Sequence, residues 1–261
     1  MNRRAFIATA IGCSTWVGAR ASQPWSVSAR GDDVALPSGA RLHRFTVNGE
    51  GSVNLQVVTF SAARCTLRIV DQPARSEAET LGAAMARLPA IAGVNGGFFT
   101  SQFEPLGLVI SQGRRAGAWQ RSSLLGGVVL VKKGRLMLLW RDEFQDSAGI
   151  SELLQAGPRL VNHGTAITGL ETGRRRPRTF IATNGAGRWL VGLAQSTTLA
   201  GLAQILATPE LIPGFEVDRA LNFDGGKSSG LWLRTAGGEP RYEEEISTVR
   251  NFVAIVPKLQ R

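Results

Sequence analysis

The sequence predicts an α+β fold: a single domain over residues 25–261, with a mixed, mostly antiparallel sheet and a few packed helices. Short segments that mix β-branched and aromatic residues with polar ones, bounded by Gly- and Asn-containing turns, predict the strands. Two segments with apolar residues at helical spacing predict the packed helices. The chain has 261 residues, of which 43% are hydrophobic and 19% charged, so it can bury one large core.

The first residues differ from the rest and predict an export signal over residues 1–21, with a basic start, an apolar run and small residues at its end. Arg3-Arg4 followed by Phe6 resembles a twin-arginine signal, and an ordinary Sec signal is the alternative. A third possibility is a lipoprotein anchor at Cys13. We therefore expect a periplasmic or secreted protein, since no later segment reaches the ~18 apolar residues of a membrane span.

Strands are expected along most of the chain, with tight turns at Lys133-Gly134 and at 184–187. Their ranges are 41–48, 53–60, 65–71, 90–94, 106–111, 125–132, 135–141, 178–183, 188–194, 220–223, 229–234 and 251–256.

Three helices are expected between these strands. Ser76 and Glu79 form a capping-box pattern for a helix over 77–88, which Pro89 ends. A second helix is expected over 198–207, where leucine and alanine recur at i, i+3, i+4 and i+7. A short helix is expected over 150–155.

The formal net charge of +10 rests mainly on arginine and favours anionic partners. Phosphorylated or acidic carbohydrate suits an exported protein better than nucleic acid, and no aromatic-interleaved basic stripe is present. Simple compositional bias is the alternative explanation.

The sequence predicts no metal site and no cofactor. His43 and His163 lie far apart, and the cysteines form no paired motif of the zinc type. Removal of Cys13 with the signal leaves Cys65 alone in a strand-like segment, where we expect it to fill the core.

Two predicted buried strands end in a polar residue followed by two glycines: Asn95-Gly96-Gly97 and Asp224-Gly225-Gly226. Glycine there permits close approach of a ligand to the backbone, and Asp224 supplies a carboxylate. Either segment alone is also typical of a turn. The pair predicts two walls of one site, which requires the two strand ends to meet.

Arg178 begins a predicted strand, where its guanidinium could hold a phosphate through two parallel hydrogen bonds. Arg174–Arg176, just before it, are expected to form a solvated loop. Arg250-Asn251 enters the last strand and is a weaker version of the same pattern.

With these segments the chain resembles the phosphodiester glycosidase family over roughly residues 90–256. Seven pieces stand in family order: 94–99, 105–108, 155–161, 177–179, 198–203, 221–229 and 249–252. Two positions depart from the family pattern. Lys227 replaces a usual third glycine and could change the substrate range, and Thr100 stands where members often have Asp or Asn.

The resemblance implies cleavage of a sugar from a phosphodiester, which releases free sugar and a phosphomonoester. For this reaction we expect Asp224 to act at the anomeric carbon as nucleophile or base, Arg178 to hold the phosphate, and Asn95 to orient substrate oxygens. The further substrate-binding residues that we expect are Gly96, Gly97, Phe98, Gln155, Gly225, Gly226, Ser228, Ser229, Arg250 and Asn251.

Glycosidases usually need two carboxylates, and only Asp224 lies on a matched motif. A phosphomonoester is a good leaving group, so cations that bind its charge could replace much of the general acid. Glu104 is a spare acid. A noncatalytic periplasmic glycan-binding protein and a hydrolase of the P–O bond are the alternative functions.

Overall fold

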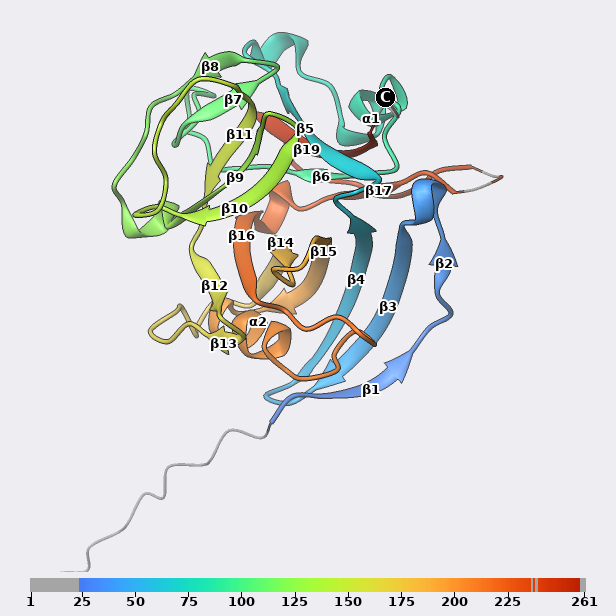
Figure 1. Ribbon diagram of the computed structural model, residues 1–261. Helices are drawn as coiled ribbons and strands as arrows, with labels where there is room; N and C mark the ends of the chain where they lie inside the picture. Colours follow the sequence, from blue (N-terminus) through green and yellow to red (C-terminus); the bar gives the residue numbers. More distant parts are fainter. Residues whose placement is uncertain (1–23, 236, 238, 259–261) are drawn as a thin grey trace, which may run out of the picture.

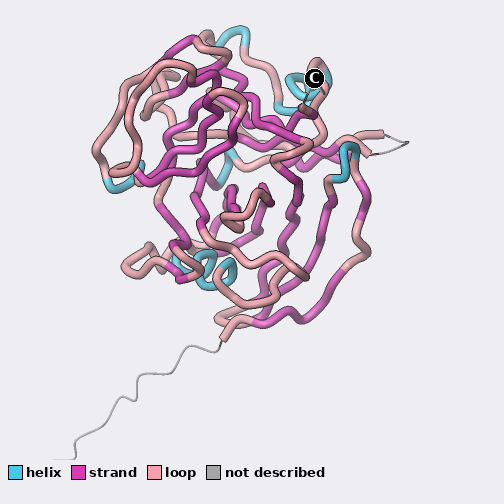
Figure 2. Tube along the Cα trace, in the orientation of Figure 1, coloured by secondary structure: helices cyan, strands magenta, loops and turns pink. Residues whose placement is uncertain are grey.

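A computed structural model describes residues 24–235, 237 and 239–258. The expected export signal over residues 1–21 therefore lies outside the described residues. Within the described part, strands dominate, as Figure 2 shows in magenta. No helix in this part is long and apolar enough to span a membrane.

The strands form three antiparallel sheets, arranged with the largest below the other two in the view of Figure 1. The nine-stranded sheet has the order β1-β3-β4-β15-β14-β16-β12-β13, with β2 paired to β3. Its strands are β1 Ser26–Arg30, β2 Val34–Ala35, β3 Arg41–Asn48, β4 Ser52–Ser61, β12 Arg159–Asn162, β13 Thr165–Ala166, β14 Arg176–Thr183, β15 Arg188–Thr197 and β16 Arg219–Gly225.

The other two sheets have five strands each, and we name each after one of its inner strands. The β9 sheet, in the order β10-β9-β11-β7-β8, consists of β7 Val109–Ser111, β8 Arg114–Ala116, β9 Gly127–Lys132, β10 Arg135–Trp140 and β11 Ile150–Ala156. The β6 sheet, in the order β18-β17-β6-β19-β5, consists of β5 Cys65–Asp71, β6 Ala92–Asn95, β17 Leu231–Leu233, β18 Arg241–Glu243 and β19 Asn251–Pro257.

The predicted α+β class with one mixed sheet is wrong. The described residues contain nineteen strands but only two α-helices, α1 Leu81–Ala86 and α2 Leu199–Leu206, and every strand pairing is antiparallel. Four short 3₁₀ turns complete the regular structure: Pro37–Gly39, Arg75–Glu77, Ser123–Leu125 and Gly226–Ser228. The protein is mostly β because each sheet buries its apolar face against another sheet, which leaves few places for helices.

The expected helix over 150–155 is also wrong, because this segment is strand β11. Its apolar residues have helical spacing, but cross-strand pairing overrides that local pattern: Leu153 pairs with Leu130 and Leu154 with Val129. A β-bulge between Ile150 and Glu152 disturbs the alternation that would have revealed the strand.

Both of the other expected helices exist, and α2 matches its predicted range closely. Helix α1 is shorter than the expected 77–88, because Thr80 rather than Ser76 caps it: the Thr80 hydroxyl accepts a hydrogen bond from the Ala83 amide at 3.3 Å. Ser76 lies in a separate 3₁₀ turn.

The largest core fills the space between the three sheets, and Cys65 lies in it as expected, fully buried and without a disulfide. A second core lies between the nine-stranded sheet and α2, which covers the lower face of that sheet in Figure 1. The nine-stranded sheet is therefore buried on both faces along β14, β15 and β16.

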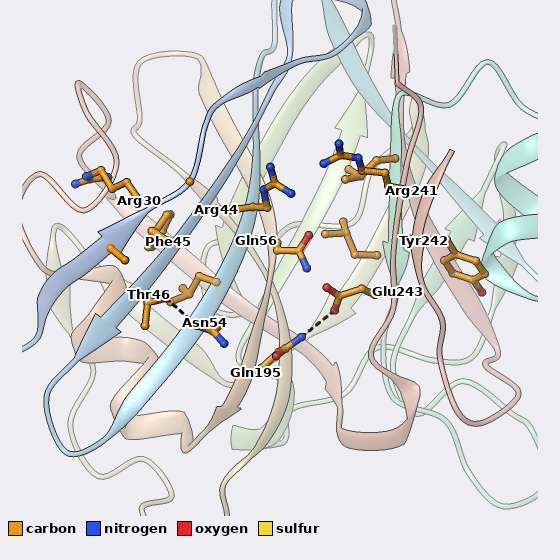
Figure 3. A pocket seen from close by; sticks show the side chains of 15 residues that line it. Arg30, Arg44, Phe45, Thr46, Asn54, Gln56, Gln195, Arg241, Tyr242 and Glu243 are labelled. Atoms are coloured by element: carbon orange, nitrogen blue, oxygen red, sulfur yellow. Dashed lines mark hydrogen bonds between the residues drawn. The ribbon is translucent and has the colours of Figure 1, made fainter. Parts of the chain in front are cut away.

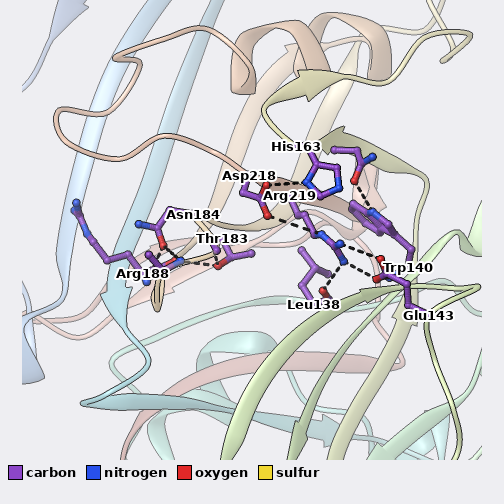
Figure 4. A network of polar contacts seen from close by, with 12 residues as sticks. Leu138, Trp140, Glu143, His163, Thr183, Asn184, Arg188, Asp218 and Arg219 are labelled. Carbon is purple, nitrogen blue, oxygen red and sulfur yellow. Dashed lines mark hydrogen bonds and ion pairs between the residues drawn. The ribbon is translucent and has the colours of Figure 1, made fainter.

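An ion pair joins the β9 sheet to the nine-stranded sheet (Figure 4). Arg219 on β16 donates from Nη1 to Glu143 Oε2 at 2.6 Å and from Nη2 to Glu143 Oε1 at 2.9 Å. Its guanidinium also lies over the Trp140 ring at 5.1 Å. This bidentate contact fixes how the two sheets meet at the end of β16 opposite Asp224.

Candidate active site

The two glycine-terminated strands meet, although they belong to different sheets. The Asn95 side-chain amide at the end of β6 donates to the Asp224 backbone carbonyl near the end of β16, at 2.8 Å. The Asp224 amide in turn donates to the Gly96 carbonyl at 2.9 Å. This reciprocal pair of hydrogen bonds joins segments 129 residues apart.

The Asn95 side chain is completely buried and its other atom is also bonded. The Asn95 Oδ1 atom accepts from the Thr179 hydroxyl at 2.6 Å and from the Gly230 amide at 3.2 Å. Because Thr179 lies on β14, the Asn95 amide links β14, β16 and the start of β17. Its buried hydrogen bonds therefore join the elements that form the site.

Gly96 is required by close packing. A Cβ at this position would lie 2.0 Å from Asn251 Oδ1, which is far closer than two atoms can approach. Asn251 on β19 uses that oxygen to accept from the Gly97 amide at 2.8 Å, and its backbone carbonyl accepts from the Gly96 amide at 2.8 Å. The predicted wall residue Asn251 thus fixes the backbone of the first glycine segment.

Asp224 is half-buried. Burial raises the pKa of Asp224, while hydrogen bonds from the Ser228 hydroxyl and the Gly225 amide oppose that shift. The Gly225 amide donates to Asp224 Oδ1 at 2.8 Å. Gly226 follows with a φ of +69°, a left-handed conformation that favours glycine, and turns the chain so that Ser228 returns to the carboxylate.

Arg178 lies beside this segment, because β14 and β16 pair so that Arg178 is opposite Gly225. Its guanidinium donates to the Thr197 carbonyl (3.2 Å), to the Arg174 carbonyl (2.8 Å) and to Glu171 Oε2 (3.1 Å). Burial lowers the pKa of Arg178, and the charge of Glu171 opposes that effect.

One end of the Arg178 guanidinium remains available. Nη1 forms no hydrogen bond with the part of the chain that the structure describes, and it lies 3.8 Å from where a Gly225 side chain would begin. This nitrogen therefore lies beside the backbone of Gly225, the residue after Asp224. A Cβ on Gly225 would also lie 3.0 Å from the Pro177 carbonyl oxygen, so this glycine packs closely against β14.

Other residues predicted for the site bond to groups of the protein itself. Gln155 is buried, with Oε1 accepting from the Gln120 amide (3.0 Å) and Nε2 donating to the Gln120 carbonyl (2.7 Å). Arg250 is also buried and makes a bidentate pair with Asp71 at 2.8 and 3.0 Å. Phe98 is half-buried and its carbonyl accepts from the Leu106 amide.

Two buried polar atoms near Asn95 lack a hydrogen-bond partner among the described residues: Ser229 Oγ and Asn251 Nδ2. Lys227 is exposed, directly beside the glycine pair. Glu104, the spare acid, has a side chain that is 69% exposed, 3.9 Å from Arg250 Nη1. Exposure of this extent is typical of a solvated surface carboxylate.

Two residues that were not predicted as site residues bond directly to predicted ones. Thr179 bonds to Asn95, and Glu171 bonds to Arg178. Thr179 directly follows Arg178, so alternation along the strand places the two side chains on opposite faces. That signal was available in the sequence. Glu171 belongs to an irregular loop, and no spacing rule predicts that it pairs with Arg178.

No three His, Cys, Asp or Glu side chains lie close enough to hold a metal ion anywhere in residues 24–235, 237 and 239–258. The Asp224 carboxylate bonds to a hydroxyl and a backbone amide, and the Arg178 guanidinium lies beside the neighbouring Gly225. These groups can bind oxygen-rich anionic ligands and place a carboxylate beside a carbon centre.

Comparison with known proteins gives structural relatives and a family. The zebrafish N-acetylglucosamine-1-phosphodiester alpha-N-acetylglucosaminidase catalytic domain, auto-inhibited by its pro-peptide, is similar at 17% identity, with a TM-score of 0.55 over 90% of this chain and 83% of that one. A hypothetical protein from Synechocystis is similar at 17% identity, with a TM-score of 0.58 over 84% of this chain and 62% of that one. Likenesses at this identity establish a shared fold. A search of curated proteins finds no match. The model of the phosphodiester glycosidase family matches residues 89–256, well over half of the chain and including both glycine segments, so the chain belongs to the phosphodiester glycosidase family.

Proposed function

We propose that the protein is an exported glycosidase that hydrolyses a sugar-1-phosphodiester, or a related phosphorylated or anionic glycan, to free sugar and a phosphomonoester. The observation that carries this proposal is the pairing of Arg178 on β14 with Gly225 on β16, which brings a guanidinium nitrogen to the backbone of the residue that follows Asp224. Family membership supplies the reaction class.

In this proposal, Asp224 acts at the anomeric carbon and Arg178 binds the phosphate. The bond between the anomeric carbon and the bridging oxygen breaks, and its electron pair leaves with the phosphomonoester. The oxygen of water bonds to the anomeric carbon, one water hydrogen remains on the sugar, and the other is released as a proton. Asp224 serves either as nucleophile or as the base for that water.

The charge that develops on the leaving phosphate explains how one carboxylate could suffice. Arg178 Nη1 and the amides around Gly225 would donate hydrogen bonds to the departing oxygen, and a partly buried site strengthens these interactions. Asn95 is proposed as a positioning residue, because all of its side-chain atoms already bond to Asp224, Thr179 and Gly230.

The experiment measures sugar release from a sugar-1-phosphodiester in ¹⁸O-labelled water. Label on the anomeric hydroxyl supports the proposal, whereas label on the phosphate indicates cleavage of the P–O bond. Asp224→Asn should reduce turnover about 10³-fold. Asp142→Asn is the control, since that side chain is 80% exposed. Saturable glycan binding without any product would instead support a noncatalytic glycan-binding protein.

Export is part of the proposal and rests on residues 1–21, chiefly Arg3-Arg4, the apolar run and the small residues at its end. The test is to sequence the N-terminus of the protein from fractionated cells. Replacement of Arg3-Arg4 by two lysines should block export if the twin-arginine route is used and should leave a Sec signal working. A lipid-modified Cys13 would show the lipoprotein alternative.

A further inference from the structure

One cavity among the described residues lies near the candidate active site, not within it. It has a volume of about 510 Å³, within the ~300–1,000 Å³ range of small-ligand sites. Residues of the nine-stranded sheet line one side, and β17 and β18 of the β6 sheet line the other (Figure 3). None of the site residues predicted from the sequence belongs to this lining.

A cross-strand ladder connects this cavity to the site. Thr179, which bonds to Asn95, pairs with Leu193 on β15. Leu193 pairs with Gln56 on β4, and Gln56 pairs with Arg44 on β3. Paired residues share one face of a sheet, and three strand spacings of ~4.8 Å amount to about 14 Å. The cavity residues Gln56 and Arg44 therefore lie on the same face of the nine-stranded sheet as Thr179, with the buried Leu193 between them.

The other wall gives a second connection. Leu231 lines the cavity, and it directly follows Gly230, whose amide donates to Asn95 Oδ1 at 3.2 Å. The cavity and the candidate active site are thus linked through Thr179 and Gly230, which both bond to Asn95.

The lining of the cavity carries three arginines and one carboxylate, that of Glu243, and two of the arginines have no partner among the described residues. The side chains of Arg44 and Arg241 form no hydrogen bond or ion pair with residues in the described ranges, and Figure 3 shows them approaching from different elements with Gln56 between them. Arg30, a third arginine of the lining, is instead bonded to the carbonyls of Glu210 and Leu211. Two free guanidinium groups in one cavity fit carboxylate groups.

The uncharged side chains of the cavity are suited to sugar hydroxyls. Gln56, Asn54 and Gln195 each carry an amide, which both donates and accepts hydrogen bonds. Gln195 Nε2 donates to Glu243 Oε2 at 3.1 Å, which leaves the second oxygen of Glu243 as an acceptor. The amides can bond to the hydroxyls of a glycan, and the guanidinium groups beside them can bind its carboxylates.

We propose that this cavity binds the carboxylate-bearing sugar residues of an acidic glycan, next to the residue that is cleaved at Asp224. Its assignment to the substrate rests on the proposed function. The affinity for acidic sugar residues depends only on Arg44, Arg241 and the amides between them.

The test measures binding of an oligogalacturonate to the purified protein by calorimetry. Arg44→Gln and Arg241→Gln should each weaken binding roughly tenfold, and the double variant more, because each removes one charge-assisted contact. Arg135→Gln is the control, an exposed arginine on the distant β10 strand. Equal binding by all three single variants and the parent protein would overturn the proposal.

Two further ligands identify the chemistry. A neutral oligosaccharide of the same length should bind at least tenfold more weakly, and a poly-glutamate of the same charge should also bind weakly. Binding of poly-glutamate as tight as that of the oligogalacturonate would overturn the assignment to sugar, and tight binding of the neutral chain would overturn the role of the arginines.

The two proposals fail separately. Asp224→Asn should retain full oligogalacturonate binding. If the parent protein binds this ligand through Arg44 and Arg241 but releases no sugar from phosphodiesters, the proposed activity fails and the cavity assignment stands. If sugar is released but no acidic oligosaccharide binds, the cavity assignment fails alone.

Discussion

The Asn95 side-chain amide donates to the Asp224 backbone carbonyl at 2.8 Å and so joins β6 of one sheet to β16 of another. Thr179 orients that amide, because its hydroxyl needs Asn95 Oδ1 as an acceptor. The position of the Asp224 carboxylate therefore depends on a hydroxyl on a third strand.

Thr179→Val tests this dependence, since valine keeps the shape of threonine and removes the hydroxyl. We expect kcat to fall about tenfold and the free energy of unfolding to fall by about 1 kcal/mol, because one buried hydrogen bond is lost. Urea denaturation and steady-state kinetics measure both quantities.

Thr183→Val is the matched control for this variant. Thr183 lies on the same strand, and its hydroxyl donates to the Arg188 carbonyl at 3.1 Å, at the opposite end of β14. Thr183→Val should lower the free energy of unfolding by about as much as Thr179→Val and leave kcat unchanged. Equal loss of kcat in both variants would show a general effect of stability instead of positioning.

Gly96→Ala adds only one methyl group, yet it should lower the free energy of unfolding strongly. The new Cβ would lie 2.0 Å from Asn251 Oδ1, so Asn251 must move and release the Gly97 amide. We expect a loss of about 2–4 kcal/mol in the free energy of unfolding. Gly173→Ala is the control, because its Cβ would meet Glu171 Oε1 at an ordinary 3.5 Å. A thermal melt of Gly96→Ala like that of the parent protein contradicts this prediction.

Many local elements, but not the fold class, could be predicted from the sequence. The hairpins at Lys133-Gly134 and 184–187, strand β3 and helix α2 follow short-range rules and form where expected. Segment 150–155 does not form the expected helix, because pairing of β11 with β9 outweighs a helical pattern. Sorting of strands into three sheets depends on long-range pairing, which local patterns do not encode.

The candidate site shows the same division. Asn95 and Asp224 stand out because glycines follow a polar residue at the end of an apolar strand, a pattern visible in sequence. The hydrogen-bond partners of a side chain are not visible in the sequence. Arg250 looks like an anion ligand in the sequence, yet in the structure its donors bond to Asp71 and Phe103. Which guanidinium is free depends on tertiary contacts.

The ion pair between Arg219 and Glu143 should stabilise the protein in a pH-dependent way. The hydrogen bond from Arg219 holds the pKa of Glu143 below its usual range. A lowered folded-state pKa gives stability that is present above the unfolded pKa of about 4.3 and is lost as pH falls through the folded value.

Glu143→Gln should therefore lower the free energy of unfolding by about 0.5–1 kcal/mol at pH 7, a value limited by the 40% exposure of the carboxylate, and by less at pH 3. Urea denaturation at both pH values measures this. Glu244→Gln, at an exposed position, should show no difference. A Glu143→Gln effect that is equal at both pH values would refute the electrostatic explanation.

Arg178 should contribute to transition-state binding through both charge and geometry. Arg178→Gln should lower kcat/KM about 10²-fold, since it removes the cation next to the departing phosphate. Arg178→Lys restores charge but not the fork that also bonds to Thr197 and Arg174, so we expect an intermediate loss of about tenfold. Kinetics with a sugar-1-phosphodiester measure both, with Arg114→Gln as a surface control. Equal activity of the glutamine and lysine variants would exclude a role for the charge.

Asp224 should control both activity and stability as pH changes. Because burial raises its pKa, the acid limb of kcat/KM should have a midpoint above the ordinary aspartate value of about 3.9, since the reaction needs the ionised form. A raised folded-state pKa also means that the ionised carboxylate destabilises the fold once pH exceeds the unfolded value.

Asp224→Asn removes that ionisation and keeps an oxygen that can accept from the Gly225 amide. Its thermal midpoint should exceed that of the parent protein at pH 7, and the two midpoints should converge near pH 3, where the parent carboxylate is protonated in both states. Calorimetry at the two pH values measures the difference. A variant that is less stable than the parent protein at pH 7 would show that hydrogen bonds from Ser228 and Gly225 outweigh the burial of the charge.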